Sequence, residues 1–160
     1  MLRENSEKGA TPKLQELITK EAIILKAFVS DWKDAIKKAG EILVKIGAVE
    51  PRYISAMIEF TKKLGPYIVI TKGVALPHAR PEDGVLKPCF SILTLRKPVE
   101  FGNVNNDPVD LVIGFGARDN SSHLKALAQL AKLLQNKEDT NMIRSANNSE
   151  EVLDVLKKYD

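Results

Sequence analysis

Two histidines are the residues of this chain best suited to chemistry, and the first lies in a stiff loop. His78 stands in the segment KGVALPHARPEDG, directly after Pro77. Proline fixes its own φ and keeps the preceding residue extended, so this segment presents the imidazole at a defined angle. Because a neutral imidazole attacks electrophiles near neutral pH, the pattern predicts a nucleophile at His78. The alternative is a surface-loop histidine without a chemical role.

The second histidine lies in a pattern that predicts the start of a helix. His123 stands in ARDNSSHLKAL, directly after Ser121 and Ser122. Backbone N–H groups at a helix N-terminus attract anions, and the two serine hydroxyls add further donors. The segment therefore predicts a phosphate seat in which His123 donates a hydrogen bond. The alternative is an ordinary capping sequence followed by a half-buried histidine.

The remaining residue types support no other chemistry. Two histidines and one cysteine fall short of a closed Cys/His zinc set, so we expect no metal site. Cys89 opens an apolar segment and is interpreted as a core residue rather than a nucleophile. The sequence contains no G-x-G-x-x-G, Walker A, G-x-S-x-G or H-E-x-x-H pattern.

Composition indicates one ordinary globular domain. The chain has 160 residues, of which 44% are hydrophobic and 28% charged, close to the average of soluble domains. Its net charge of +3 is too small to suggest nucleic-acid binding. No apolar run approaches the roughly 18–20 residues of a membrane span, and residues 1–12 lack the apolar core of a signal peptide. Together with the single cysteine, these features predict a cytoplasmic protein.

Strand and helix signals alternate along the chain and predict an α/β fold. Strands are expected at 22–29, 67–71, 89–96 and 109–117. Helices are expected at 14–19, 32–46, 51–64, 124–134, 138–145 and after residue 149. The glycines and prolines of 72–88 predict a stretch that is mostly loop. Because connections such as 97–108 are too short for a crossover helix, we expect a mixed sheet with helices on both faces.

Longer segments of the chain resemble a known family. ITKGVALPHARPEDG is similar to the phosphorylation-site segment of the mannitol/fructose-type enzyme IIA domain of the bacterial phosphotransferase system. The segments EPRY, GPY, KPVEF and NDPVD resemble the ascorbate-specific branch more closely. The match runs from about residue 14 to the end. Residues 1–13 are therefore predicted to be a flexible tail, and residues 14–160 the phosphoryl-carrier domain.

This resemblance implies a function and its partners. It implies that His78 accepts a phosphoryl group from the phosphocarrier HPr and passes it to a cysteine of enzyme IIB, with membrane-embedded enzyme IIC as an indirect partner and L-ascorbate as the transported sugar. His123 matches the second active-site histidine of the family. The family's mixed sheet flanked by helices is implied as well, and no metal or organic cofactor is. Three alternatives remain: a regulatory module of the nitrogen type, an enzyme IIA for mannitol, fructose or another sugar, and an unrelated binding protein.

The chain lacks one positively charged residue that the family has. The mannitol enzyme IIA has an arginine in the helix before the strand, where this chain has Phe60 at about the equivalent place. Arg80 is the expected substitute, because residues two apart in an extended segment point to the same side and Arg80 is two after His78. The alternative is an exposed arginine paired with Glu82 or Asp83. Other candidate cations are Arg118, Lys72 and Arg52.

Overall fold

A five-stranded mixed sheet forms the centre of the structure, a computed structural model that describes residues 12–119, 121 and 123–159. Across the sheet the strands lie in the order β1 (Ile23–Ala27), β4 (Cys89–Val99), β5 (Val109–Gly116), β3 (Val74–Ala75) and β2 (Val69–Thr71). The pairs β1–β4 and β3–β5 are parallel, whereas β4–β5 and β2–β3 are antiparallel. The predicted mixed sheet is confirmed.

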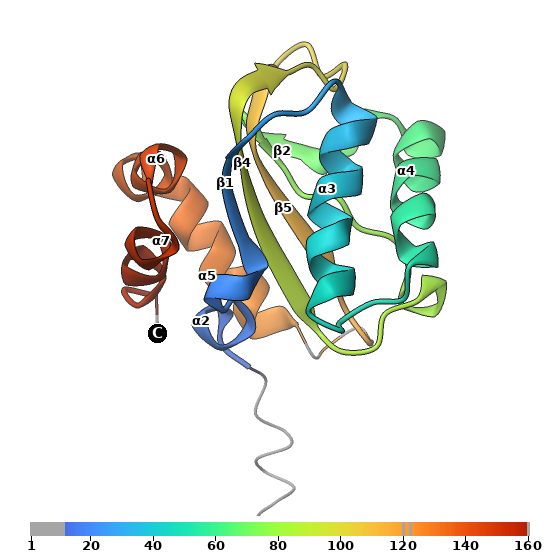
Figure 1. The fold of residues 1–160 in the computed structure, drawn as a ribbon, viewed down its shortest axis with the longest axis horizontal. Helices are drawn as coiled ribbons and strands as arrows, with labels where there is room; N and C mark the ends of the chain where they lie inside the picture. The colour runs from blue at the N-terminus through green and yellow to red at the C-terminus, as the bar shows by residue number, and fades with distance from the viewer. Residues whose placement is uncertain (1–11, 120, 122, 160) are drawn as a thin grey trace, which may run out of the picture.

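Helices cover both faces of this sheet, as predicted (Figure 1). On one face α3 (Trp32–Lys45) packs on β4 and β5, and α4 (Arg52–Leu64) packs on α3. The other face carries α2 (Leu14–Leu17), α5 (Leu124–Gln135), α6 (Lys137–Ser145) and α7 (Ser149–Leu156). Short 3₁₀ turns occupy Lys20–Ala22, Pro66–Ile68 and Pro81–Asp83. Within the described part of the chain, no helix is long and apolar enough to cross a membrane.

The amphipathic pattern of α3 explains its place against the sheet. Asp31 caps the helix, because its side chain accepts a hydrogen bond of 2.9 Å from the backbone N–H of Asp34. Ala35, Ile36 and Ala39 then follow at helical spacing, and all three are fully buried. Helix α3 thus lies between the sheet and α4, and it holds α4 in place.

The strand β3 differs from the sequence prediction, which gave 72–88 as mostly loop. Val74 and Ala75 pair in parallel with β5, at Leu111 and Val112. A turn at Gly73, whose φ is +73°, reverses the chain from β2 into β3. Two residues are too few to produce a periodic signal, so only the neighbouring strand reveals them as a strand. This short strand leads directly to the predicted nucleophile.

Candidate active site

Both histidines pack against one aromatic side chain at the edge of the sheet where β3 and β5 end. Because these strands are parallel, their carboxyl ends lie at the same edge, with His78 following β3 and Phe115 near the end of β5. The Phe115 ring lies 5.8 Å from the His78 ring and 5.1 Å from the His123 ring, between centroids. One aromatic side chain therefore contacts both imidazoles, and the structure brings the two predicted residues into one site.

Backbone hydrogen bonds fix the segment that leads to His78. The Leu76 N–H donates to the Ile68 carbonyl over 2.7 Å, and the Phe115 N–H donates to the Pro77 carbonyl over 3.1 Å. These bonds extend the sheet ladder up to the residue before the histidine. The stiff presentation expected from the proline therefore has a second cause in the sheet.

A buried tyrosine holds the segment on the far side of His78. Tyr53 of α4 is fully buried, and its hydroxyl accepts a hydrogen bond of 2.9 Å from the Ala79 N–H. The same hydroxyl donates to the Phe115 carbonyl over 2.8 Å. Burial raises the pKa of Tyr53 well above its ordinary value, so the hydroxyl keeps its proton. Helix α4 is thus tied to the histidine loop and to the end of β5 at one atom.

The imidazole of His78 is oriented by its own loop. Its Nδ1 lies 2.8 Å from the Leu76 carbonyl oxygen. A carbonyl only accepts hydrogen bonds, so Nδ1 carries the proton and Nε2 carries the lone pair. The ring is partly buried and also packs against Phe60, with 5.6 Å between the ring centroids. This arrangement leaves Nε2 as the ring nitrogen that can act as a nucleophile.

His123 directly precedes α5, and its carbonyl accepts a hydrogen bond of 2.9 Å from the Leu127 N–H. Its Nδ1 is buried and has no hydrogen-bond partner among the residues that the structure describes. The ring can therefore meet an incoming group only through Nε2. In the preceding loop, the Ser121 N–H and hydroxyl both donate to Asp119, over 2.9 and 3.4 Å. Ser122, the other predicted anion-binding residue, lies outside the described residues.

Arg80 forms ion pairs with the acidic residues that follow it. Its guanidinium lies 3.2 Å from the Asp83 carboxylate and 3.7 Å from that of Glu82. The hydrogen bond with Asp83 raises the pKa of Arg80 and lowers the pKa of that carboxyl. These are the contacts expected if Arg80 is an exposed arginine paired with Glu82 or Asp83. A phosphoryl group on His78 would have to compete with both carboxylates for the guanidinium.

A surface cleft of about 510 Å³ connects Arg80 with the wall of the histidine site. It is lined by Ala56, Glu59, Phe60, Lys62, Lys63, Arg80 and Asp83. Of the other predicted cations, Arg52 pairs with Glu50 over 2.7 Å, Arg118 donates to the Leu86 carbonyl over 2.9 Å, and Lys72 is exposed. The cations that share this cleft with Phe60 are Lys62 and Lys63, in the last turn of α4, and Arg80.

Apolar side chains surround the other side of His78. Leu64, Tyr67 and Ile70 are exposed by 48%, 79% and 46%. Together with His78 and Phe60 they line a shallow hollow of about 180 Å³. Large apolar side chains that are grouped and exposed are typical of surfaces that other proteins contact. His78, the predicted nucleophile, thus lies beside exposed apolar side chains.

Comparison with known proteins shows the family of the chain. Residues 16–159 match the model of the family described as "Phosphoenolpyruvate-dependent sugar phosphotransferase system, EIIA 2". The chain belongs to this family. Membership gives it a phosphotransferase role in sugar transport, and the family resemblance drawn from the sequence is confirmed.

The relatives of this EIIA are similar over nearly their whole length. The ascorbate-specific PTS system EIIA component of Escherichia coli strain K12 is 39% identical over 141 residues, which cover 88% of this chain and 92% of the relative. The solution structure of the mannitol-specific cryptic phosphotransferase enzyme IIA of Escherichia coli matches with a TM-score of 0.81 and 31% identity, covering 92% of this chain and 99% of that one. Enzyme IIAMTL of Escherichia coli, in complex with phosphorylated enzyme IIBMTL, matches with a TM-score of 0.78 and 32% identity, covering 89% of this chain and 99% of its own.

Two residues of the EIIA site were missed by sequence reasoning. Tyr53 lies within the helix expected at 51–64 and Phe115 within the strand expected at 109–117, but neither was singled out for a role in the site. A buried tyrosine requires a hydrogen-bond partner for its hydroxyl, which was the one available signal for Tyr53. Nothing in the sequence distinguishes Phe115 from the other apolar residues of its strand.

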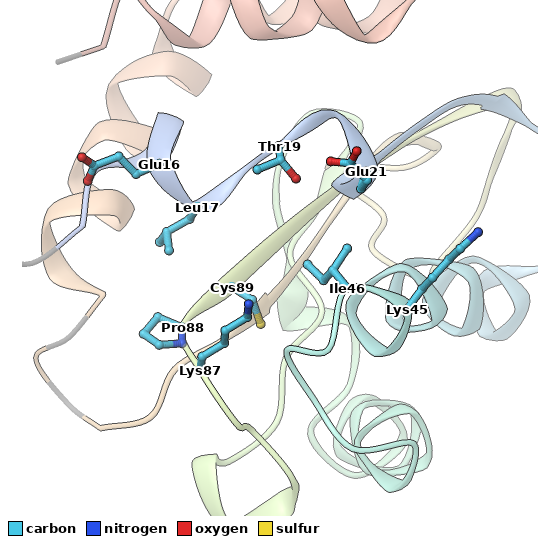
Figure 2. Close-up of a pocket in the computed structure, with 9 residues that line it drawn as sticks. All are labelled: Glu16, Leu17, Thr19, Glu21, Lys45, Ile46, Lys87, Pro88 and Cys89. Carbon is cyan, nitrogen blue, oxygen red and sulfur yellow. The ribbon is translucent and has the colours of Figure 1, made fainter.

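A second cleft, of about 530 Å³, contains none of the predicted site residues (Figure 2). It is lined by Glu16, Leu17, Thr19, Glu21, Lys45, Ile46, Lys87, Pro88 and Cys89. Cys89 is only 2% exposed, and its burial raises the thiol pKa to about 12. Such a thiol is not a nucleophile near neutral pH, in line with its interpretation as a core residue. Among the described residues, no group of three or more His, Cys, Asp and Glu side chains is arranged to hold a metal ion.

Proposed function

We propose that this EIIA accepts a phosphoryl group from phospho-HPr on His78 and passes it to a cysteine of enzyme IIB. The observation that carries this proposal is the contact of 2.8 Å between the His78 Nδ1 and the Leu76 carbonyl. This bond commits one nitrogen to the protein and leaves Nε2 to attack phosphorus. The sheet ladder on one side and Tyr53 on the other hold the backbone of the loop during that attack.

Phosphoryl transfer requires the protein to position the reacting groups and to stabilise negative charge, and it requires no covalent group besides the nucleophile. In the first step the bond between phosphorus and the donor breaks as the bond to the His78 Nε2 forms. In the second step that bond breaks as the bond to the enzyme IIB sulfur forms. His123 donates from Nε2 to a phosphoryl oxygen, and Arg80 supplies positive charge from the neighbouring cleft. The Ser121 donors, which are bonded to Asp119 in the free chain, are proposed to turn to the same oxygens once the phosphoryl group is present, together with Ser122.

Two protein partners must reach His78 in turn, and the surface around it supports this. The exposed side chains of Leu64, Tyr67 and Ile70 offer apolar contact area on one side. In the adjoining cleft Lys62 pairs with Glu59 over 3.4 Å, and Lys63 offers further positive charge. The relative that forms a complex with phosphorylated enzyme IIBMTL supports enzyme IIB as one partner. HPr is proposed as the other, and enzyme IIC as a partner that is reached only through enzyme IIB.

We propose L-ascorbate as the sugar of this system and the cytoplasm as its location. The 39% identity with the ascorbate-specific component supports the first point. An enzyme IIA does not touch the sugar, so the assignment depends on which enzyme IIB accepts the phosphoryl group. The test is a transfer assay from the phosphorylated chain to the enzyme IIB proteins of ascorbate and mannitol systems. Preferred transfer to the mannitol protein would overturn the choice of sugar, and transfer to neither would favour a regulatory role.

The decisive experiment for the carrier function is incubation with phospho-HPr, followed by intact mass and mapping of the phosphohistidine. We expect one phosphoryl group, on His78, and none on the His78→Ala variant. His123→Ala is the matched control, because it removes the neighbouring imidazole and leaves the acceptor in place. Circular dichroism establishes that both variants are folded. Labelling of His78→Ala at the wild-type level would refute the proposal.

A further inference from the structure

We propose that Tyr53 is a positioning residue for phosphoryl transfer, whose single hydroxyl sets the geometry of both imidazoles. This inference rests on the proposed carrier function, because it assigns a role within that reaction. Tyr53 does not touch the phosphoryl group in this scheme. It acts through Ala79, the residue after the nucleophile, and through Phe115, whose ring contacts both histidines.

The hydrogen bonds of the hydroxyl have assigned directions. A backbone N–H can only donate, so the oxygen of Tyr53 accepts from Ala79 over 2.9 Å. A carbonyl can only accept, so the one hydroxyl proton goes to Phe115, whose carbonyl oxygen lies 2.8 Å away. The Ala79 carbonyl is more distant, at 3.3 Å. The hydroxyl therefore links two backbone groups that no covalent path joins at short range.

With this link, backbone hydrogen bonds hold the chain on both sides of His78. On its N-terminal side the last ladder bond runs from the Phe115 N–H to the Pro77 carbonyl. On its C-terminal side the first bond is the one from Ala79 to Tyr53. Removing the hydroxyl would leave Ala79 without this bond, and the next backbone bond from the loop to another element would then be at Gly84, whose carbonyl accepts from the Glu50 N–H. The imidazole would then sample a wider range of positions, and transfer rates are sensitive to shifts of about 1 Å.

The same hydroxyl reaches His123 through Phe115. Both backbone polar groups of Phe115 are bound, its N–H by Pro77 and its carbonyl by Tyr53. Its ring lies 5.1 Å from the His123 ring, whose Nδ1 has no hydrogen bond within the described residues. Packing against Phe115 is thus a main restraint on that imidazole. A shift of the strand end would move the donor that is proposed to meet the phosphoryl oxygens.

The experiment compares Tyr53→Phe with Tyr159→Phe. Both remove one hydroxyl and keep the ring, but the Tyr159 hydroxyl donates to Asp139 of α6, on the sheet face opposite to α4. Single-turnover phosphorylation is measured over a range of phospho-HPr concentrations, below the melting temperature of each variant. For Tyr53→Phe we expect the maximal rate to fall at least about tenfold, with the half-saturating concentration within about twofold of wild type, because the docking surface is unchanged. Tyr159→Phe should keep the wild-type rate.

A second readout requires no partner protein. In the free chain, the ring resonances of His78 and His123 should shift in Tyr53→Phe and stay in place in Tyr159→Phe. If Tyr53→Phe does not fold, the wild-type chain supplies the test: the Ala79 amide hydrogen should exchange slowly with solvent because it is bonded to the Tyr53 hydroxyl, and rapid exchange would overturn the link.

The outcomes separate this inference from the function on which it rests. If wild type accepts no phosphoryl group, the carrier function fails, and the resonances still test the positioning role. Wild-type rates in Tyr53→Phe, equal slowing in both tyrosine variants, or unshifted histidine resonances would each overturn the role of Tyr53.

Discussion

At the scale of single residues, the two histidines offer the same ring nitrogen, Nε2, for different proposed tasks. In His78 the Nδ1 is bonded to the Leu76 carbonyl, and in His123 the Nδ1 is buried. The first is proposed to form a bond with phosphorus, and the second to donate to phosphoryl oxygens. These tasks predict different effects of mutation on the two transfer steps.

Replacing His123 by alanine should slow transfer to enzyme IIB more than it slows acceptance from phospho-HPr. A positioned donor to a developing charge contributes about 2.7–4 kcal/mol in oxyanion sites, which is a factor of about 10²–10³ in rate. Rapid-quench single-turnover measurements of both steps check this. His123→Gln, which keeps an N–H donor, is the matched variant and should lose less. Wild-type rates in both steps for His123→Ala would exclude the donor role.

Because Asp83 competes with the phosphoryl group for the guanidinium of Arg80, mutation of Arg80 and mutation of Asp83 should change the rate of phosphohistidine formation in opposite directions. Arg80→Ala should shorten the lifetime of the phosphohistidine and slow its formation, because a cation is lost beside the phosphoryl group. Asp83→Asn should speed formation, because it weakens the pairing at 3.2 Å while its amide oxygen still accepts the Arg80 N–H. The measurements are formation rate and hydrolysis half-life. If Arg80→Ala and Arg80→Lys both stay within about twofold of wild type, Arg80 is a surface charge only.

The limits of sequence reasoning are visible in these residues. His78 and His123 could be singled out because proline stiffness and helix-start patterns are local. Tyr53 and Phe115 could not, because their roles arise where a helix, a loop and a strand end meet. The backbone of Arg80 is extended, as expected from the sequence. Its guanidinium pairs with Asp83 because the turn at Pro81 brings that carboxylate within reach.

At the scale of elements, the long helices and the strands β4 and β5 were predictable because their apolar periodicity extends over many residues. The hairpin of β2 and β3 was not, because its pairing depends on β5 and on one glycine. The backbone of Gly73 donates to the Asn106 carbonyl over 2.9 Å and accepts from Leu111 over 3.1 Å. This turn sets the start of the segment that ends in His78.

Gly73→Ala should therefore destabilise the fold more than Gly47→Ala. Both glycines have positive φ, +73° and +76°, where an L-residue loses about 1–2 kcal/mol. A Cβ at Gly47 meets no atom within 4 Å, whereas at Gly73 it would lie 2.6 Å from Nη2 of Arg144. That nitrogen donates to the Lys72 carbonyl over 2.7 Å, so moving it breaks a bond that contributes about 1 kcal/mol. Urea denaturation of both variants measures the difference, and equal losses would contradict this account.

At the scale of the whole molecule, the fold class was predictable from composition and from the order of the elements. A chain of this length buries enough apolar surface for one core, and the alternation of helices and strands restricts it to a layered α/β arrangement. The core joins both helical layers through the sheet, as the buried residues Ile36, Ile92 and Leu133 illustrate. Because one core holds the domain together, its unfolding should be a single cooperative transition.

Cys89 offers a measurement of that transition, because its thiol is buried at the start of β4 and bonded weakly to the Gly116 carbonyl. Burial raises its pKa to about 12, so at about pH 8 almost no thiolate is present in the folded chain, while an unfolded cysteine of pKa about 8.5 is substantially ionised. We expect a thiol reagent to label the native protein at a rate set by unfolding, rising with urea in step with the loss of circular dichroism. The raised pKa also fixes the sign of the pH effect: stability from this group is complete below the unfolded pKa and is lost as pH rises through that value toward about 12.

Labelling by a small and a bulky thiol reagent distinguishes global unfolding from local access. Cys89 lines the cleft of Figure 2, so a local opening there would admit the small reagent first. If unfolding of the whole core is required, both reagents give the same rate under conditions in which opening limits labelling, and the rate falls when the fold is stabilised. Cys89→Ser supplies the blank for each reagent. Rapid labelling of the folded chain at about pH 8 would show that the thiol is not held in the core as described.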